Sequence, residues 1–192
     1  MDYSEGQDPT GEGPFKPDWW AGGDSKGECG VPLFYRWGSA MPKDNHGGGG
    51  NKMWYSFDWG NLHVAMMDAE HDWQMGSNQY SWLEADLAAV DRNKTPWLVV
   101  TSHRPVYTTP ECEQKTHLIS EIMQENLNPL FEKYQVNLVL AGHAHWYQRL
   151  CSVRGGKCVD DLGGTTHVTI GSAGKYLIIL DNNRILIQTT PK

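Results

Sequence analysis

The sequence contains no run of apolar residues approaching the about eighteen that cross a bilayer, so we expect no membrane-spanning helix and no membrane partner. Basic residues are also few: 16 Lys and Arg stand against 23 Asp and Glu, for a net charge of -7. Nucleic acid is therefore excluded as an expected partner, because its phosphates are bound by clustered Lys and Arg. The first residues do not form a signal peptide. The 192 residues, 39% of them hydrophobic, suit one domain with a sizeable core.

Two segments with the pattern of buried strands each end in histidine. Residues 136–140 are mostly apolar with branched side chains, and His143 and His145 follow them after a turn. Residues 97–102 form a second such strand, and His103 follows at once. Open α/β sheets bind ligands at the carboxyl ends of their strands, where imidazole is a common metal ligand. A lone His-x-His pair also fits core packing, but two strands that each deliver histidine favour a metal site, because buried imidazole needs partners.

The motifs around these histidines are Ser-His-Arg-Pro-Val-Tyr at residues 102–107 and Ala-Gly-His-Ala-His-Trp-Tyr-Gln-Arg at 141–149. They resemble the last two metal-binding motifs of the purple acid phosphatases, within the calcineurin-like metallophosphoesterases. Further similar segments precede them, at residues 27–32, 54–58, 70–72 and 79–87. The resemblance covers roughly residues 1–174.

The resemblance implies a cofactor, a dinuclear metal centre of Fe(3+) beside Zn(2+), Mn(2+) or Fe(2+). By similarity, His103 and His143 would bind the divalent ion, and His145 would bind the iron. The family's other ligands are an Asp, a bridging Asp with a nearby Tyr, and the Asn of a Gly-Asn-His-Glu segment. The corresponding motifs are absent here, so we expect this centre to be incomplete in the chain.

The fold class implied is α/β (α+β), a partial metallophosphoesterase-type β-sandwich with flanking helices and without the N-terminal half of the catalytic domain. Residues 1–192 would be the C-terminal portion of that domain. We divide it into a loop-rich segment at 1–53, a core at 54–174 and a divergent tail at 175–192. The pattern of the tail predicts a final hairpin, in which residues 176–180 pair with residues 184–188. The alternative is that an altered gene model produced this segment.

The activity implied is that of an acid phosphatase, a hydrolase in which a metal-activated hydroxide attacks a phosphate monoester. Its partner would be a small-molecule phosphate ester or another phosphorylated substrate. His71, in an ionisable cluster at residues 68–72, is the candidate catalytic side chain. Two alternatives stay open: an inactive metal-binding or phosphate-binding fragment, and a phosphodiesterase or nucleotidase of the same superfamily. The oligomeric state is left open.

Cysteine is scarce, with four in the chain, but one pair is informative. Cys151 and Cys158 would face each other on a hairpin with a four-residue loop over 153–156, either as a disulfide or as two free thiols. Asn93 begins a glycosylation sequon, which Pro96 directly after it weakens. A disulfide and a glycan together favour a secreted, extracellular or vacuolar compartment.

Within the predicted core, a hairpin at 53–67 precedes a helix that Ser77 caps. A second helix begins at about Thr116, and we expect a fresh cap at Asn128, because Pro129 would disrupt a continuous helix. The remaining histidines are expected to be structural (His63, His167) or solvent-facing (His46, His117).

Overall fold

The computed structural model describes residues 53–108, 114–160, 163–171, 176–181 and 184–189. The predictions for the loop-rich segment, including the one for His46, lie outside these residues. No helix within the described ranges is long and apolar enough to cross a membrane.

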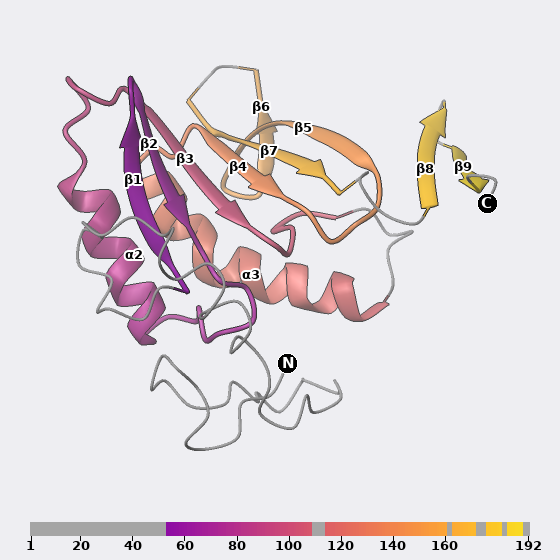
Figure 1. The fold of residues 1–192 in the computed structure, drawn as a ribbon, viewed down its shortest axis with the longest axis horizontal. Helices are drawn as coiled ribbons and strands as arrows, with labels where there is room; N and C mark the ends of the chain where they lie inside the picture. The colour runs from indigo at the N-terminus through magenta and orange to yellow at the C-terminus, as the bar shows by residue number, and fades with distance from the viewer. Residues whose placement is uncertain (1–52, 109–113, 161–162, 172–175, 182–183, 190–192) are drawn as a thin grey trace.

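Seven strands form one mixed sheet in the order β1-β2-β3-β4-β7-β5-β6 (Figure 1). Strands β2, β3, β4 and β7 are parallel, whereas β1, β5 and β6 run antiparallel to their neighbours. The predicted α/β class is therefore confirmed. The strand bounds are β1 Tyr55–Trp59, β2 Leu62–Met66, β3 Trp97–Ser102, β4 Leu138–Ala141, β5 Tyr147–Arg154, β6 Lys157–Val159 and β7 Thr165–Ile170.

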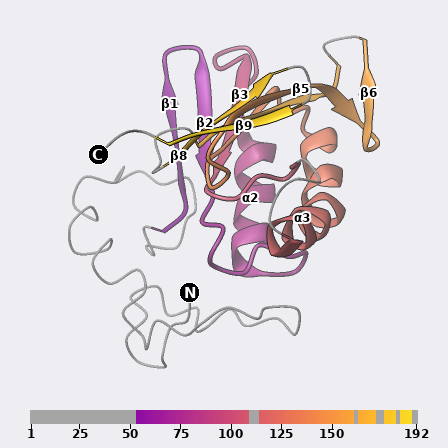
Figure 2. The same ribbon diagram turned by 90° about the vertical axis from the view of Figure 1, so that its right-hand side faces the viewer.

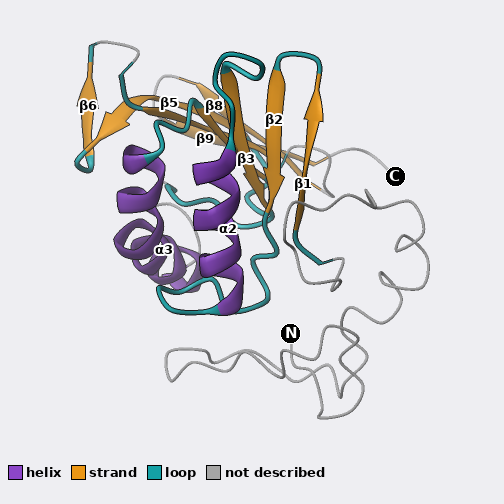
Figure 3. Cartoon of the chain, turned by 90° about the vertical axis from the view of Figure 1, so that its left-hand side faces the viewer, coloured by secondary structure: helices purple, strands orange, loops and turns teal. Residues whose placement is uncertain are grey.

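Two helices, α2 (Asn78–Ala89) and α3 (Gln114–Lys133), connect the parallel strands. Because β2, β3 and β4 lie in sequential order and such crossovers are right-handed, both helices must cover the same face of the sheet. Figures 2 and 3 show them side by side on that face. The predicted cap is confirmed: the Ser77 hydroxyl oxygen accepts a hydrogen bond from the Tyr80 backbone N–H at 3.1 Å.

The core lies between this face and the helices. Side chains alternate along each strand, and in β2 and β4 every second residue is buried. In β3 three consecutive residues are buried, Leu98, Val99 and Val100. Each fully buried aliphatic or aromatic side chain contributes about 1.5–3 kcal/mol. The fully or almost fully buried members include Ala65, Leu98, Val100 and Val139 from the strands and Leu83, Met123, Leu127 and Phe131 from the helices.

The expectation of a break before Pro129 is wrong, because α3 runs continuously to Lys133. Proline in a helix interior costs about 3 kcal/mol, since it lacks an N–H and crowds the preceding turn. The side chains on either side of Pro129 offset this cost by burial in the core, at 0–1% exposure: Leu127, Leu130 and Phe131.

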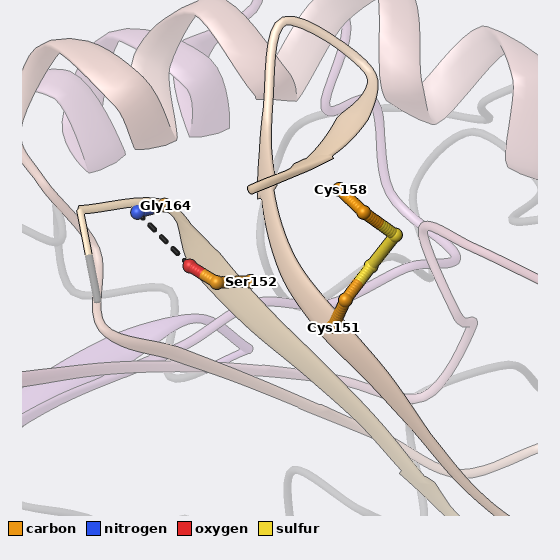
Figure 4. The surroundings of a disulfide bond; sticks show 4 residues. All are labelled: Cys151, Ser152, Cys158 and Gly164. Atoms are coloured by element: carbon orange, nitrogen blue, oxygen red, sulfur yellow. Dashed lines mark hydrogen bonds between the residues drawn. A yellow bond between two sulfur atoms is a disulfide. The ribbon is translucent and has the colours of Figure 1, made fainter. Parts of the chain in front are cut away.

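The hairpin of β5 and β6 contains the predicted disulfide, between Cys151 and Cys158, with Cα atoms 5.5 Å apart (Figure 4). The expected four-residue loop is wrong. Arg154 pairs with Lys157, so the turn has only two residues, Gly155 and Gly156, with φ of 58° and 70°. Glycine adopts this left-handed region without strain, and a two-residue turn of this kind matches the twist of the strands.

The tail forms a separate two-stranded antiparallel sheet, β8 (Tyr176–Asp181) with β9 (Arg184–Thr189). The hairpin interpretation of this segment is therefore confirmed for the described residues.

Candidate metal centre

His103 and His143 meet at the carboxyl edge of the sheet. Strands β3 and β4 are parallel neighbours, with Ser102 opposite Ala141, so the residues that follow them emerge side by side. His143 Nδ1 lies 3.1 Å from His103 Nε2, and the two rings pack edge to face with centroids 5.0 Å apart. Side chains forty positions apart in the sequence are thus brought into direct contact.

The backbone of this edge is tightly organised. The Gly142 N–H donates to the His103 carbonyl oxygen at 3.1 Å. His143 adopts φ of 60°, a conformation that non-glycine residues rarely take and that recurs at functional sites. Gly171, after β7, lies so close to the loop that an added Cβ would be 2.0 Å from the Ala144 carbonyl oxygen. Only glycine fits there, and its close approach supports the segment between His143 and His145.

The separation of the two imidazole nitrogens suits ligands of one ion. Metal–nitrogen bonds of about 2.0–2.1 Å place two neighbouring nitrogen ligands roughly 2.8–3.4 Å apart, depending on the coordination geometry. His103 and His143, at 3.1 Å, fall within this range. His145 is exposed, and in the part of the chain that the structure describes no three His, Cys, Asp or Glu side chains converge on a common point. Two of the three predicted ligands are therefore brought together.

An ion pair that the sequence did not reveal supports the loop of His103. The Arg104 Nε donates to Glu70 Oε1 at 3.1 Å, and both side chains are largely buried. It joins the loop after β2 to the loop after β3. The only sequence signal was opposite charge in two segments that both follow strands, which does not specify a partner. Because a largely buried pair has a preferred geometry, it restrains the backbone next to His103.

His71 lies inside the same loop but faces the interior. It is 1% exposed, its Nδ1 is 2.6 Å from Asp68 Oδ2, and its ring packs edge to face on Trp54. Asp68 is held in turn by Gln79, which accepts from the Asp68 N–H and donates to its carbonyl oxygen. His71 thus helps to fix the loop in this structure, and its catalytic role stays a prediction.

The other described histidines lie where they were expected. His63 and His167 are buried, at 4% and 5% exposure, and the His117 side chain on α3 is 44% exposed and lies 3.7 Å from Glu121. Asn93 is exposed in a turn in which its N–H donates to Asp91.

Comparison with known proteins agrees with this geometry. The model of the family described as "Calcineurin-like phosphoesterase" matches residues 29–147, more than half of the chain. The chain belongs to the calcineurin-like phosphoesterase family. Among solved structures, the chain is similar to the purple acid phosphatase PPD1 of yellow lupin seeds, with a TM-score of 0.71 and 30% identity over 93% of this chain and 31% of that one.

Curated relatives include purple acid phosphatases of Arabidopsis thaliana. "Probable inactive purple acid phosphatase 9" is 40% identical over 84% of this chain and 26% of its own length. "Purple acid phosphatase 18" is also 40% identical, over 72% of this chain and 30% of its own length. A protein of Hordeum vulgare named "Nucleotide pyrophosphatase/phosphodiesterase" is 33% identical over 80% of this chain and 43% of its own length. The chain thus spans about a quarter to two fifths of these relatives.

Proposed function

We propose that this chain acts as part of an acid phosphatase that hydrolyses phosphate monoesters, with His103 and His143 binding a divalent ion and His145 binding iron. The observation that carries the proposal is the 3.1 Å approach of the two imidazole nitrogens at the carboxyl edge of the sheet. Family membership supports it, because the family consists of phosphoesterases with a dinuclear metal centre.

The protein's own residues would supply nitrogen donors and their orientation. His143 presents Nδ1 and His103 presents Nε2, so each imidazole must be neutral at that atom when it binds. Protons therefore compete with the metal as pH falls. The bound metals would supply neutralisation of phosphate charge and activation of water. The ion pair of Arg104 with Glu70 would keep His103 in place as substrate enters.

The finer assignments follow from the same proposal. The substrate would be a small-molecule phosphate ester, and the divalent ion would be Zn(2+), Mn(2+) or Fe(2+). The disulfide of Cys151 and Cys158 supports an oxidising compartment, secreted or vacuolar. The exposure of Asn93 is compatible with glycosylation there.

Two observations favour an alternative, a metal-binding or phosphate-binding protein without turnover. No third ligand joins His103 and His143 among the residues that the structure describes. Several relatives also carry the word "inactive" in their names. A phosphodiesterase activity is the third candidate, in keeping with the name of the Hordeum vulgare relative.

Metal content separates these candidates. The purified chain would be reconstituted with iron and zinc, analysed for bound metal, and assayed with a chromogenic phosphate monoester and a matching diester at mildly acid pH. Two ions per chain with monoester turnover support the acid phosphatase. One ion or none, without turnover, supports the inactive alternative, and a preference for the diester supports the third.

The substitution His143→Ala tests the assignment of the ligands. It removes one of two converging nitrogens, so we expect loss of the divalent ion, by more than the 10–100-fold in affinity typical of supporting residues. His117→Ala is the control, because His117 lies on α3 and contacts Glu121. Unchanged metal content in His143→Ala would defeat the assignment.

A further inference from the structure

A polar pocket lies at the opposite edge of the sheet from His103 and His143. Its volume is about 420 Å³. The segment that precedes β4 and the start of β7 form its floor, so it faces the amino ends of the parallel strands. The end of α3 and the β5–β6 hairpin form its sides. The lining residues used below are Arg92, Glu132, Gln135, Asn137, Arg154 and Gly163.

Arg92 is a half-buried cation with neutral partners. Its Nη2 donates to the Gln135 carbonyl oxygen at 3.3 Å and to Asn137 Oδ1 at 3.0 Å. Its Nη1 is buried and makes no hydrogen bond with the described residues, and no carboxylate among them pairs with it. Burial lowers the pKa of the guanidinium, which nevertheless stays charged. A desolvated charge without a counterion is costly, and an anion in the pocket would offset that cost.

Arg154 places a second guanidinium on the pocket wall. Its Nε donates to the Gly163 carbonyl oxygen at 3.0 Å. The hairpin that carries it is fixed by the disulfide and by the hydrogen bond of Gly164 N–H to Ser152 Oγ at 3.0 Å (Figure 4). The Gly155 N–H also donates to Glu132. Glu132, the carboxylate among the described lining residues, thus accepts a hydrogen bond from the hairpin backbone. Among the described residues that line the pocket, Arg92 and Arg154 are the cations and Glu132 is the acid, within a chain of net charge -7.

We propose that this pocket binds a phosphate group through Arg92 and Arg154. Two guanidinium groups on separate walls suit a tetrahedral anion, whose oxygens point in different directions, whereas a planar carboxylate is satisfied by one guanidinium fork. The phosphate is either the free ion or the head of a small organic phosphate, for which the volume leaves room. The pocket is formed by residues other than the histidines, so its occupation does not depend on the proposed phosphatase activity.

Titration calorimetry of the metal-free full chain tests this assignment. After chelation and at low salt, inorganic phosphate, phenyl phosphate and acetate would each be added up to about 10 mM, which detects complexes with a Kd near 1 mM. We expect phosphate or phenyl phosphate to bind and acetate to bind at least about tenfold more weakly. Binding of phenyl phosphate alone would identify the organic form. No binding of either phosphate, or equal binding of acetate, would overturn the proposal.

Variants locate the bound ion. Each of Arg92→Gln and Arg154→Gln should weaken phosphate binding about tenfold or more, because each removes a charge-assisted hydrogen bond. Arg149→Gln, on an exposed part of β5, and His143→Ala should leave it unchanged. If Arg92→Gln does not fold, as judged by circular dichroism, Arg154→Gln decides. Undiminished binding in Arg154→Gln, or loss of binding in His143→Ala, would overturn the proposal and place the ion elsewhere.

Discussion

His63 and His167 lie in the same layer between sheet and helices, yet their surroundings are opposite. His63, on β2, is held by two carboxylates: its Nδ1 is 2.7 Å from Asp58 Oδ1 and its Nε2 is 2.9 Å from Asp86 Oδ2. His167, on β7, lies against the rings of Tyr107 and Phe131, and its Nδ1 is buried without a hydrogen-bond partner among the described residues.

This difference gives the two histidines opposite titration behaviour. Burial alone disfavours the charged form of His63, but hydrogen bonds and charge attraction from Asp86 and Asp58 outweigh it and raise its pKa. At His167 nothing opposes burial, which lowers the pKa to about 4. Burial by itself therefore does not decide whether a core histidine is charged; its neighbours do.

The largest expected effect is that of His63→Ala. The change leaves the Asp86 carboxylate buried at 2% exposure, with the Ser56 hydroxyl as its remaining side-chain hydrogen-bond partner among the described residues. Breaking a buried ion pair from one side costs about 3–5 kcal/mol, so we expect the free energy of unfolding to fall by that amount. Urea denaturation below pH 6.5 measures it. The contribution is fully present there and is lost as pH rises through the raised pKa of folded His63.

Ser56→Ala is the matched control for that comparison. It removes one hydrogen bond to the same carboxylate and leaves the imidazole in place, so the loss should be about 1 kcal/mol. Equal losses in the two variants would mean that the charge of His63 does not matter.

A comparable effect of opposite sign is expected at His167. The unfolded chain binds a proton near pH 6.5, whereas the folded chain does so only near pH 4, so stability falls as pH drops between these values, by at most about 3 kcal/mol. His167→Leu removes this site and should flatten that part of the profile. Unfolding by urea at a series of pH values measures both slopes. An unchanged slope in His167→Leu, with His117→Ala as the control, would contradict the lowered pKa.

The smallest expected effect comes from the backbone conformation of a third histidine, His143, which lies at the edge of the sheet with φ of 60°. A side chain in this conformation costs about 1 kcal/mol that glycine avoids. His143→Gly and His143→Ala both lose the contact with His103, but the glycine variant should be more stable by about 1 kcal/mol. Thermal unfolding of the two variants measures this difference in stability. Equal stabilities would show that the edge carries no backbone strain.

Much of the local structure could be predicted from pattern alone. The cap at Ser77, the β1–β2 hairpin and the disulfide of Cys151 with Cys158 follow from short-range rules, and all three are present. The break at Pro129 failed because a local penalty was outweighed by burial of neighbouring side chains, which depends on the sheet that α3 covers. The two-residue turn at Gly155 was missed because register depends on both strands together.

The sequence by itself determined which strands end in histidine, and therefore the family and the candidate ligands His103, His143 and His145. It did not determine which of them meet. That depended on the parallel pairing of β3 with β4, which joins segments about forty residues apart through backbone hydrogen bonds that carry no residue-specific signal. The same holds for Arg92 and Arg154, since sheet order alone brings the end of α3 and the β5–β6 hairpin around one pocket.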